Sequence, residues 1–107
     1  MSDSLEKKNH YNSLYPFYKE LLTEKQQEVF ETYYFDDFSL AEIAESFEVS
    51  RNAIWDLLKK VEHNLDEYEA KLRLCEKNIK LEKQLDLLSS YCTEEGIKII
   101  NEIKEME

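Results

Sequence analysis

The scarcity of backbone breakers is the feature that most limits the folds open to this chain. Its 107 residues contain one glycine, Gly96, and one proline, Pro16. Tight β-hairpin turns, phosphate-binding loops and dinucleotide-binding turns all need glycines that this chain lacks, so these folds and sites are excluded. Leucine, isoleucine, valine and phenylalanine are frequent enough to build a core. The sequence therefore predicts an all-α protein whose helices are joined by short polar turns.

Capping residues indicate where the predicted helices begin. Thr23 with Gln26 and Ser39 with Glu42 each form a capping box, in which two side chains satisfy backbone N–H groups at a helix start. Pro16 suits the first turn of a short helix. The predicted helices span residues 5–15, 16–22, 24–35 and 39–47, followed by a long helix capped by Ser50 and a terminal helix over 93–106 capped by Thr93.

The segment 40–59 fits a helix-turn-helix motif. Two short helices that cross steeply need a small residue where their backbones meet, and Ala44 occupies that position. Glu48 stands at the turn position that adopts a left-handed conformation, at a cost of about 1 kcal/mol for a residue other than glycine. The apolar residues fall at the spacings that the inner faces bury: Ile43, Phe47, Val49, Ile54 and Leu57. We expect one domain, 1–107, with a tri-helical core within 5–61 and a dimerisation segment over 62–107.

Charge bears on what this motif binds. The second helix of the motif would present four candidate nucleic-acid contacts: Arg51, Asn52, Lys59 and Lys60. Asp56 lies among them and repels phosphate, and the whole chain has a formal net charge of −10. DNA binding is therefore expected to be weak. Trp55 is large and apolar with one hydrogen-bond donor, which makes it a candidate anchor for a protein partner.

Apolar residues continue along the long helix at alternating spacings of four and three, as in a coiled-coil seam. Near residue 80 the pattern slips by one position, so the helix either has two neighbours or breaks near Asn78. Packing within one chain is one reading. We favour a homodimer, because one short terminal helix cannot cover so many apolar residues. The candidate dimer contacts are Leu65, Tyr68, Leu72 and Ile79.

A basic run stands out in the otherwise acidic chain. Between residues 71 and 83 five basic side chains accompany two glutamates, a net charge of +3. The run is either a solvated helix face or a local site for RNA phosphate or an acidic protein. Its candidate partner contacts are Lys71, Arg73, Lys77 and Lys80.

Catalytic and metal chemistry find no support in the sequence. Cys75, Cys92 and the two histidines do not have metal-ligand spacing, and no nucleophile with its base can be assembled. We expect no enzymatic activity, no metal, no cofactor and no disulfide. No apolar run approaches the length of a membrane span, and the first residues lack a signal-peptide core. A cytoplasmic location is expected.

Several segments resemble the YlxM family of small bacterial helix-turn-helix proteins. The resemblance rests chiefly on residues 33–45, which read YYFDDFSLAEIAE, and on 49–54, which read VSRNAI. The motif is also similar to the promoter-reading domain of sigma factors. The YlxM resemblance implies an accessory or regulatory protein of the signal recognition particle pathway, with the particle's GTPase or RNA as partner. A sequence-specific, DNA-binding transcription regulator is the alternative. Relatives often have asparagine at the position of Glu48 and a polar residue at that of Leu57, and these departures weaken the DNA-binding inference.

Overall fold

The computed structural model describes the backbone of residues 2–106 and the side chains of residues 5–106. These residues form six α-helices and one 3₁₀ helix, with no strand, which confirms the all-α prediction. They gather into two compact units, one ending at Leu72 and one beginning at Arg73. None of the described helices is both long and apolar enough to cross a membrane. The helices are α1 (Ser2–Tyr18), η1 (Lys19–Leu21), α2 (Glu24–Tyr34), α3 (Leu40–Phe47), α4 (Arg51–Leu72), α5 (Leu74–Ser89) and α6 (Glu94–Glu105).

Both predicted capping boxes are present. The Thr23 hydroxyl accepts a hydrogen bond from the backbone N–H of Gln26, and the Gln26 side chain accepts one from the backbone N–H of Thr23. Ser39 and Glu42 make the same reciprocal pair at the start of α3. Helix α4 begins similarly, because the Ser50 hydroxyl accepts from the N–H of Ala53 at 3.1 Å. The capping hydrogen bonds join residues three positions apart, and the helices begin within one residue of the positions predicted from the sequence.

Helices α3 and α4 form the predicted helix-turn-helix. Glu48 lies in the left-handed region with φ 56° and ψ 43°, as the turn requires. The N–H of Val49 then donates to the carbonyl of Ala44 at 3.0 Å and satisfies one of the last carbonyls of α3. Ala44 is buried beside Ile43. The three-residue turn is therefore the one expected, even though its left-handed residue is a glutamate.

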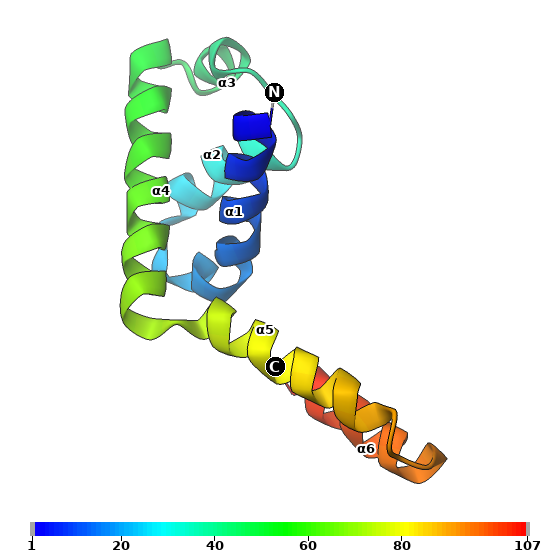
Figure 1. Ribbon diagram of the computed structural model, residues 1–107. Coiled ribbons are helices and arrows are strands. Elements are labelled where there is room, and N and C mark those ends of the chain that lie inside the picture. The colour runs from blue at the N-terminus through cyan, green and yellow to red at the C-terminus, as the bar shows by residue number, and fades with distance from the viewer. Residues whose placement is uncertain (1, 107) are drawn as a thin grey trace. The chain divides into compact units, whose positions relative to one another are not determined.

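Helix α4 is the central element of the first unit and contacts α1, α2 and α3 (Figure 1). The largest fully buried side chains come from all four α-helices of this unit: Tyr18 from α1, Val29 and Phe30 from α2, Ile43 from α3, and Ile54, Val61 and Leu65 from α4. Helices α2, α3 and α4 form the predicted tri-helical core, and α1 packs on it as a fourth helix.

The prediction that Pro16 starts a second helix is wrong. Helix α1 continues through Pro16 to Tyr18, and only the short η1 follows. A proline inside a helix costs about 3 kcal/mol. Buried aromatics on either side of it offset that cost, because Tyr15 stacks on Phe30 at 4.2 Å between ring centroids and Tyr18 is fully buried. Tertiary packing thus overrides the local preference of proline.

The long helix predicted from residue 50 is two helices. It ends at Leu72, and Arg73 takes a left-handed conformation with φ 54° before α5 begins. The sequence placed a possible break near Asn78, five residues too late. The helix breaks because its two rows of apolar side chains pack in different units. The row that contains Leu65 is buried in the first unit, whereas Leu85, from the row that is shifted by one position, is buried in the second.

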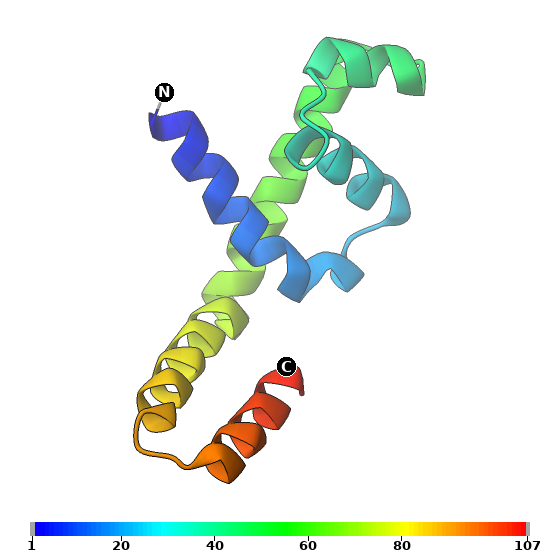
Figure 2. The ribbon, with the colours of Figure 1, turned by 90° about the vertical axis from the view of Figure 1, so that its right-hand side faces the viewer.

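The second unit is a hairpin of α5 and α6, which lie side by side (Figure 2). Leu85 and Ile100 are buried in it. Thr93 occupies the N-cap position of α6 as predicted, although its side chain makes no capping hydrogen bond. Gly96 has a packing role, because a Cβ atom built on it would lie 2.8 Å from Cβ of Cys92. The glycine thus lets the connection between the helices approach α6.

We expect Ala44→Glu to abolish cooperative unfolding of the first unit, because Ala44 is only 6% exposed and the change buries an unpaired charge. Urea unfolding followed by circular dichroism measures this. Ala41→Glu is the matched control, since Ala41 lies on the same helix but is exposed. A cooperative, fully helical Ala44→Glu protein would refute the assigned packing of α3 on α4.

We expect Gly96→Ala to lower the stability of the hairpin. Alanine in a helix is ordinarily favoured over glycine by about 1 kcal/mol, but here the added methyl group would collide with Cys92. Hydrogen exchange of α6 amides reports on this unit alone. Glu95→Ala at the neighbouring exposed position should leave exchange unchanged. Slower exchange in Gly96→Ala would show that the close approach does not exist.

Candidate binding surface of the helix-turn-helix

The first turn of α4 presents two polar side chains. Arg51 and Asn52 follow the Ser50 cap and are both exposed. A guanidinium and an amide at a helix N-terminus can reach phosphate oxygens and base edges. Lys60 is another predicted nucleic-acid contact. It lies on α4 more than two turns after Arg51 and is also exposed. The beginning of α4 therefore offers some of the chemistry of a DNA reader.

Trp55 dominates the next turn of α4. Its side chain is 49% exposed, which is unusual for a residue of this size. Nζ of Lys59 lies 5.2 Å from the centroid of the Trp55 ring, in a cation–π contact. A small pocket of about 70 Å³ opens beside the ring, between α4 and the apolar side chains of Tyr33 and Leu40. The surface thus combines a large aromatic group with a small pocket lined by both apolar and charged side chains, the charged ones being Lys7, Lys59 and Glu62.

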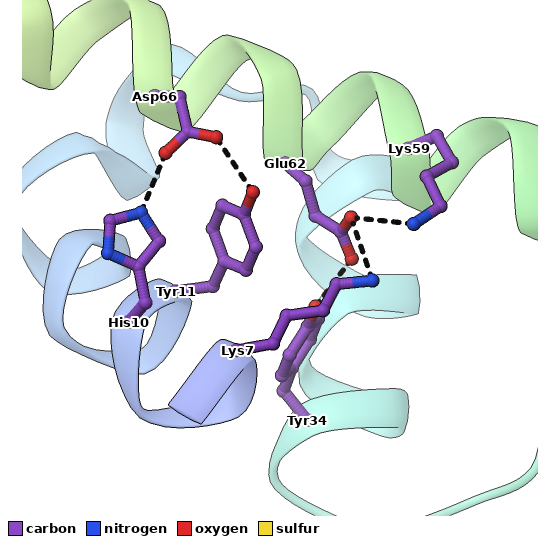
Figure 3. A network of polar contacts seen from close by, with 7 residues as sticks. All are labelled: Lys7, His10, Tyr11, Tyr34, Lys59, Glu62 and Asp66. Atoms are coloured by element: carbon purple, nitrogen blue, oxygen red, sulfur yellow. Dashed lines mark hydrogen bonds and ion pairs between the residues drawn. The ribbon is translucent and has the colours of Figure 1, made fainter. Parts of the chain in front are cut away.

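The buried carboxylate of Glu62 is among the groups that line this pocket. Glu62 of α4 is 4% exposed and accepts a hydrogen bond of 2.5 Å from the Tyr34 hydroxyl of α2. Its other oxygen lies 3.3 Å from Nζ of Lys7 on α1 and 3.4 Å from Nζ of Lys59 (Figure 3). One carboxylate therefore ties three helices together. A buried charge needs such partners, because an unpaired one would be strongly destabilising.

A second carboxylate extends the network one turn along α4. Asp66 is 2.7 Å from Nε2 of His10 and accepts a hydrogen bond of 2.7 Å from the Tyr11 hydroxyl (Figure 3). Both partners lie on α1. The contact is more exposed than that of Glu62 and adds a second point of attachment between α1 and α4.

These contacts shift proton equilibria in the folded chain. Burial, and then the hydrogen bond to Glu62, raise the pKa of Tyr34 well above its ordinary value of 10.0. Burial and the bond to Asp66 raise the pKa of Tyr11 in the same direction. Partial burial, together with the nearby Lys59 ammonium, lowers the pKa of Lys7. The folded state therefore holds the two phenol protons more tightly than the unfolded chain does.

The structure separates the four predicted nucleic-acid contacts into two kinds. All four are exposed, but Lys59 is in addition engaged by Glu62 and by the Trp55 ring. Asp56 is exposed close to them.

The predicted partner contacts are distributed over both units. Lys71 lies in the last turn of α4, and Arg73 is the left-handed residue that follows it. Lys77 and Lys80 are exposed on α5, where Lys80 lies 3.2 Å from a carboxylate oxygen of Glu76.

The predicted dimer seam is also divided. Leu65 is fully buried within the first unit, and Tyr68 lies against Tyr18 with 5.8 Å between ring centroids. Leu72 and Ile79 are exposed. Among these four positions, only the last two leave much apolar surface for another chain.

Sequence reasoning missed the junction around Glu62. Its partners lie 55 and 28 positions earlier in the chain, at Lys7 and Tyr34, so no local pattern joins them. A signal existed, because Glu62 lies four residues after Leu58 and three before Leu65, on the buried stripe of α4. A charged residue at a core position of a helix predicts oppositely charged or hydrogen-bonding partners from the elements packed against it. In the described part of the chain, no three His, Cys, Asp or Glu side chains gather as metal ligands.

A helical core with α3 and α4 joined by a three-residue left-handed turn defines a helix-turn-helix protein. Comparison with known proteins gives the family: UPF0122, described as "Putative helix-turn-helix protein, YlxM / p13 like", matches residues 5–106. The chain belongs to this family.

Named relatives are similar over most of their length. A UPF0122 protein of Listeria innocua is 49% identical over 91 residues, which are 85% of this chain and 83% of the relative. One of Geobacillus sp. is 43% identical over 106 residues, covering 96% of each chain. UPF0122 protein YofM of Lactococcus lactis is 43% identical over 105 residues, covering 96% of this chain and 92% of its own. The resemblance seen in the sequence is thereby confirmed.

We expect Tyr34→Phe to lower the free energy of unfolding by about 1.5–3 kcal/mol, the usual contribution of a hydrogen bond to a charged group. Tyr33→Phe is the matched control, since Tyr33 lies next to it and is only half-buried. The raised pKa of Tyr34 also has a consequence for pH: its stabilising effect is complete below about pH 10 and is lost as pH rises further. Urea titrations at pH 8 and above pH 10 test both points. An equal loss in the two variants at pH 8 would contradict the role given to the Tyr34 hydroxyl.

Proposed function

We propose that this protein is a non-enzymatic, cytoplasmic accessory or regulatory protein whose helix-turn-helix binds a protein partner. The observation that carries the proposal is the exposed Trp55 beside its pocket. Interface anchors are typically aromatic side chains at a pocket, with polar groups around them, and Trp55 is a half-exposed aromatic ring that borders such a pocket. Arg51, four residues before Trp55 on α4, and Lys59, four residues after it, supply these polar groups.

The charge arrangement argues against duplex DNA as the principal ligand. Firm DNA binding typically uses six to ten phosphate contacts. On the described surface of α4, Lys59 is shared with Glu62, and Asp56 is exposed between the remaining cations. Few positive charges are left to meet a phosphate backbone.

The resemblance to the YlxM family supplies the proposed pathway. We infer that the partner belongs to the bacterial signal recognition particle pathway and is the particle's GTPase. The family membership supports a helix-turn-helix protein, and the pathway is what the resemblance to the YlxM family implies.

A transcription regulator is the second candidate. The exposed Arg51 and Asn52 at the start of α4 favour it, because this is where recognition helices contact bases. The two candidates differ in their salt dependence, since phosphate contacts weaken steeply as salt rises and apolar contacts do not.

The test is a pair of titrations, one with random duplex DNA and one with the particle's GTPase, at low and moderate salt. We expect a dissociation constant for DNA no tighter than about 10⁻⁵ M near physiological salt. We expect Trp55→Ala to weaken GTPase binding by about 2 kcal/mol or more, as for an interface hot spot. Leu21→Ala, at another exposed apolar residue, is the control and should have no effect.

Two results would contradict the proposal. Sub-micromolar, sequence-selective DNA binding that depends on Arg51 would establish the transcription-regulator alternative. Salt-sensitive binding of the particle's RNA that is lost on replacing Lys77 and Lys80 would instead identify RNA as the partner.

A further inference from the structure

The hairpin of α5 and α6 has more exposed apolar side chains than buried ones. Units of fewer than about 40 residues usually need a disulfide, a metal or association with another chain to be stable. Both cysteines of the chain are free, and the described residues contain no metal-ligand cluster. The buried apolar side chains of the hairpin are Cys75, Leu85 and Ile100, whereas its exposed ones include Leu74, Ile79, Leu81, Leu87, Leu88, Ile97, Ile99 and Met106. A further layer of packing is missing.

The exposed apolar residues are concentrated on one side of the hairpin. Asp86 of α5 and Lys104 of α6 form an ion pair of 2.6 Å and so mark one side on which the two helices meet. At 3.6 residues per turn, Leu81 lies about 140° round α5 from Asp86, and Ile99 lies about 140° round α6 from Lys104. The side opposite the ion pair therefore carries a continuous surface, here called the hairpin apolar face: Leu74, Leu81, Leu88, Ile99 and Met106.

The spacing on this face suits packing against further helices. Leu74, Leu81 and Leu88 are seven residues apart on α5, and Met106, the C-cap residue of α6, follows Ile99 by seven residues. A seven-residue repeat on two adjacent antiparallel helices is the pattern of one half of a four-helix bundle. A second copy of the hairpin supplies the other half with the same length and repeat, and two-fold pairing closes the assembly.

The charges along the edges of the face favour this occupant. On α5, Lys77 precedes Leu81 by four residues and so borders the face with a positive charge. On α6, Glu95 and Glu102 border Ile99 with negative charges, four residues before it and three after it. When α5 of one chain packs on α6 of another, the positive edge of α5 meets the negative edge of α6. When α5 packs on α5, two positive edges meet, so the charges favour the pairing of α5 with α6.

We propose that the hairpin apolar face is a homodimer interface, in which two copies form a four-helix bundle with α5 of one chain against α6 of the other. The sequence also predicts a homodimer, but through the seam of Leu65, Tyr68, Leu72 and Ile79 and not through this face. Leu65 is buried within the first unit, and Ile79 lies within about 20° of Asp86 on the side of the ion pair, away from this face.

The test is analytical ultracentrifugation of the full-length chain at tens of micromolar, comparing Leu81→Asp with Ile79→Asp. The two positions are matched, since both lie on α5 and are 42% and 48% exposed. We expect the unmodified protein and Ile79→Asp to sediment as dimers. Leu81→Asp should raise the dimer dissociation constant by about 100-fold or more, because a carboxylate would be buried in the interface. Leu88→Asp should behave like Leu81→Asp, and far-ultraviolet circular dichroism confirms that each variant is folded.

Two outcomes would overturn the proposal. If the unmodified protein is a monomer at these concentrations, the face is covered by another part of the chain or by a different protein. If Ile79→Asp dissociates the dimer while Leu81→Asp and Leu88→Asp do not, the interface is the seam predicted from the sequence.

Discussion

The buried carboxylate of Glu62 is the interaction on which the first unit depends. It is the one buried charged residue among the described side chains, and its partners come from α1 and α2 as well as from α4. A charge in this position is tolerated only if its hydrogen bonds are made, so the carboxylate fixes how the three helices approach one another. Asp66 repeats the attachment of α1 one turn further along α4. The short helix α3 is then placed against a framework that is already fixed.

The same carboxylate shapes the binding surface. It engages Lys7 and Lys59, two cations that would otherwise be available to a phosphate backbone, and Lys59 in turn lies over Trp55. The helix-turn-helix thereby presents an aromatic group with few uncommitted positive charges. A fold shared with DNA-binding proteins does not by itself imply DNA binding, since the fold supplies the position of α4 and the side chains decide the ligand.

Features encoded over three or four residues could be predicted from the sequence. The two capping boxes, the position of Ala44 at the helix crossing and the left-handed Glu48 all follow from local chemistry, and the structure confirms them. Features that depend on distant residues could not be predicted. Pro16 stays within α1 because of aromatic packing against α2, and the Glu62 junction joins residues up to 55 positions apart. The change of register predicts either two neighbours for one helix or a break near Asn78; the break lies at Arg73, because its position depends on which stripe each unit buries.

The central claim is that Glu62 withholds Lys7 and Lys59 from nucleic acid, and Glu62→Gln tests it most directly. Glutamine keeps the shape and can still accept the Tyr34 hydrogen bond, but it no longer neutralises the two lysines. The measurement is the salt dependence of binding to random duplex DNA, with Glu67→Gln, an exposed site on the same helix, as the control for the change in net charge. The account predicts that Glu62→Gln binds more tightly, with a logarithmic salt slope steeper by about one to two, while Glu67→Gln keeps the original slope. Equal slopes for the two variants would contradict it.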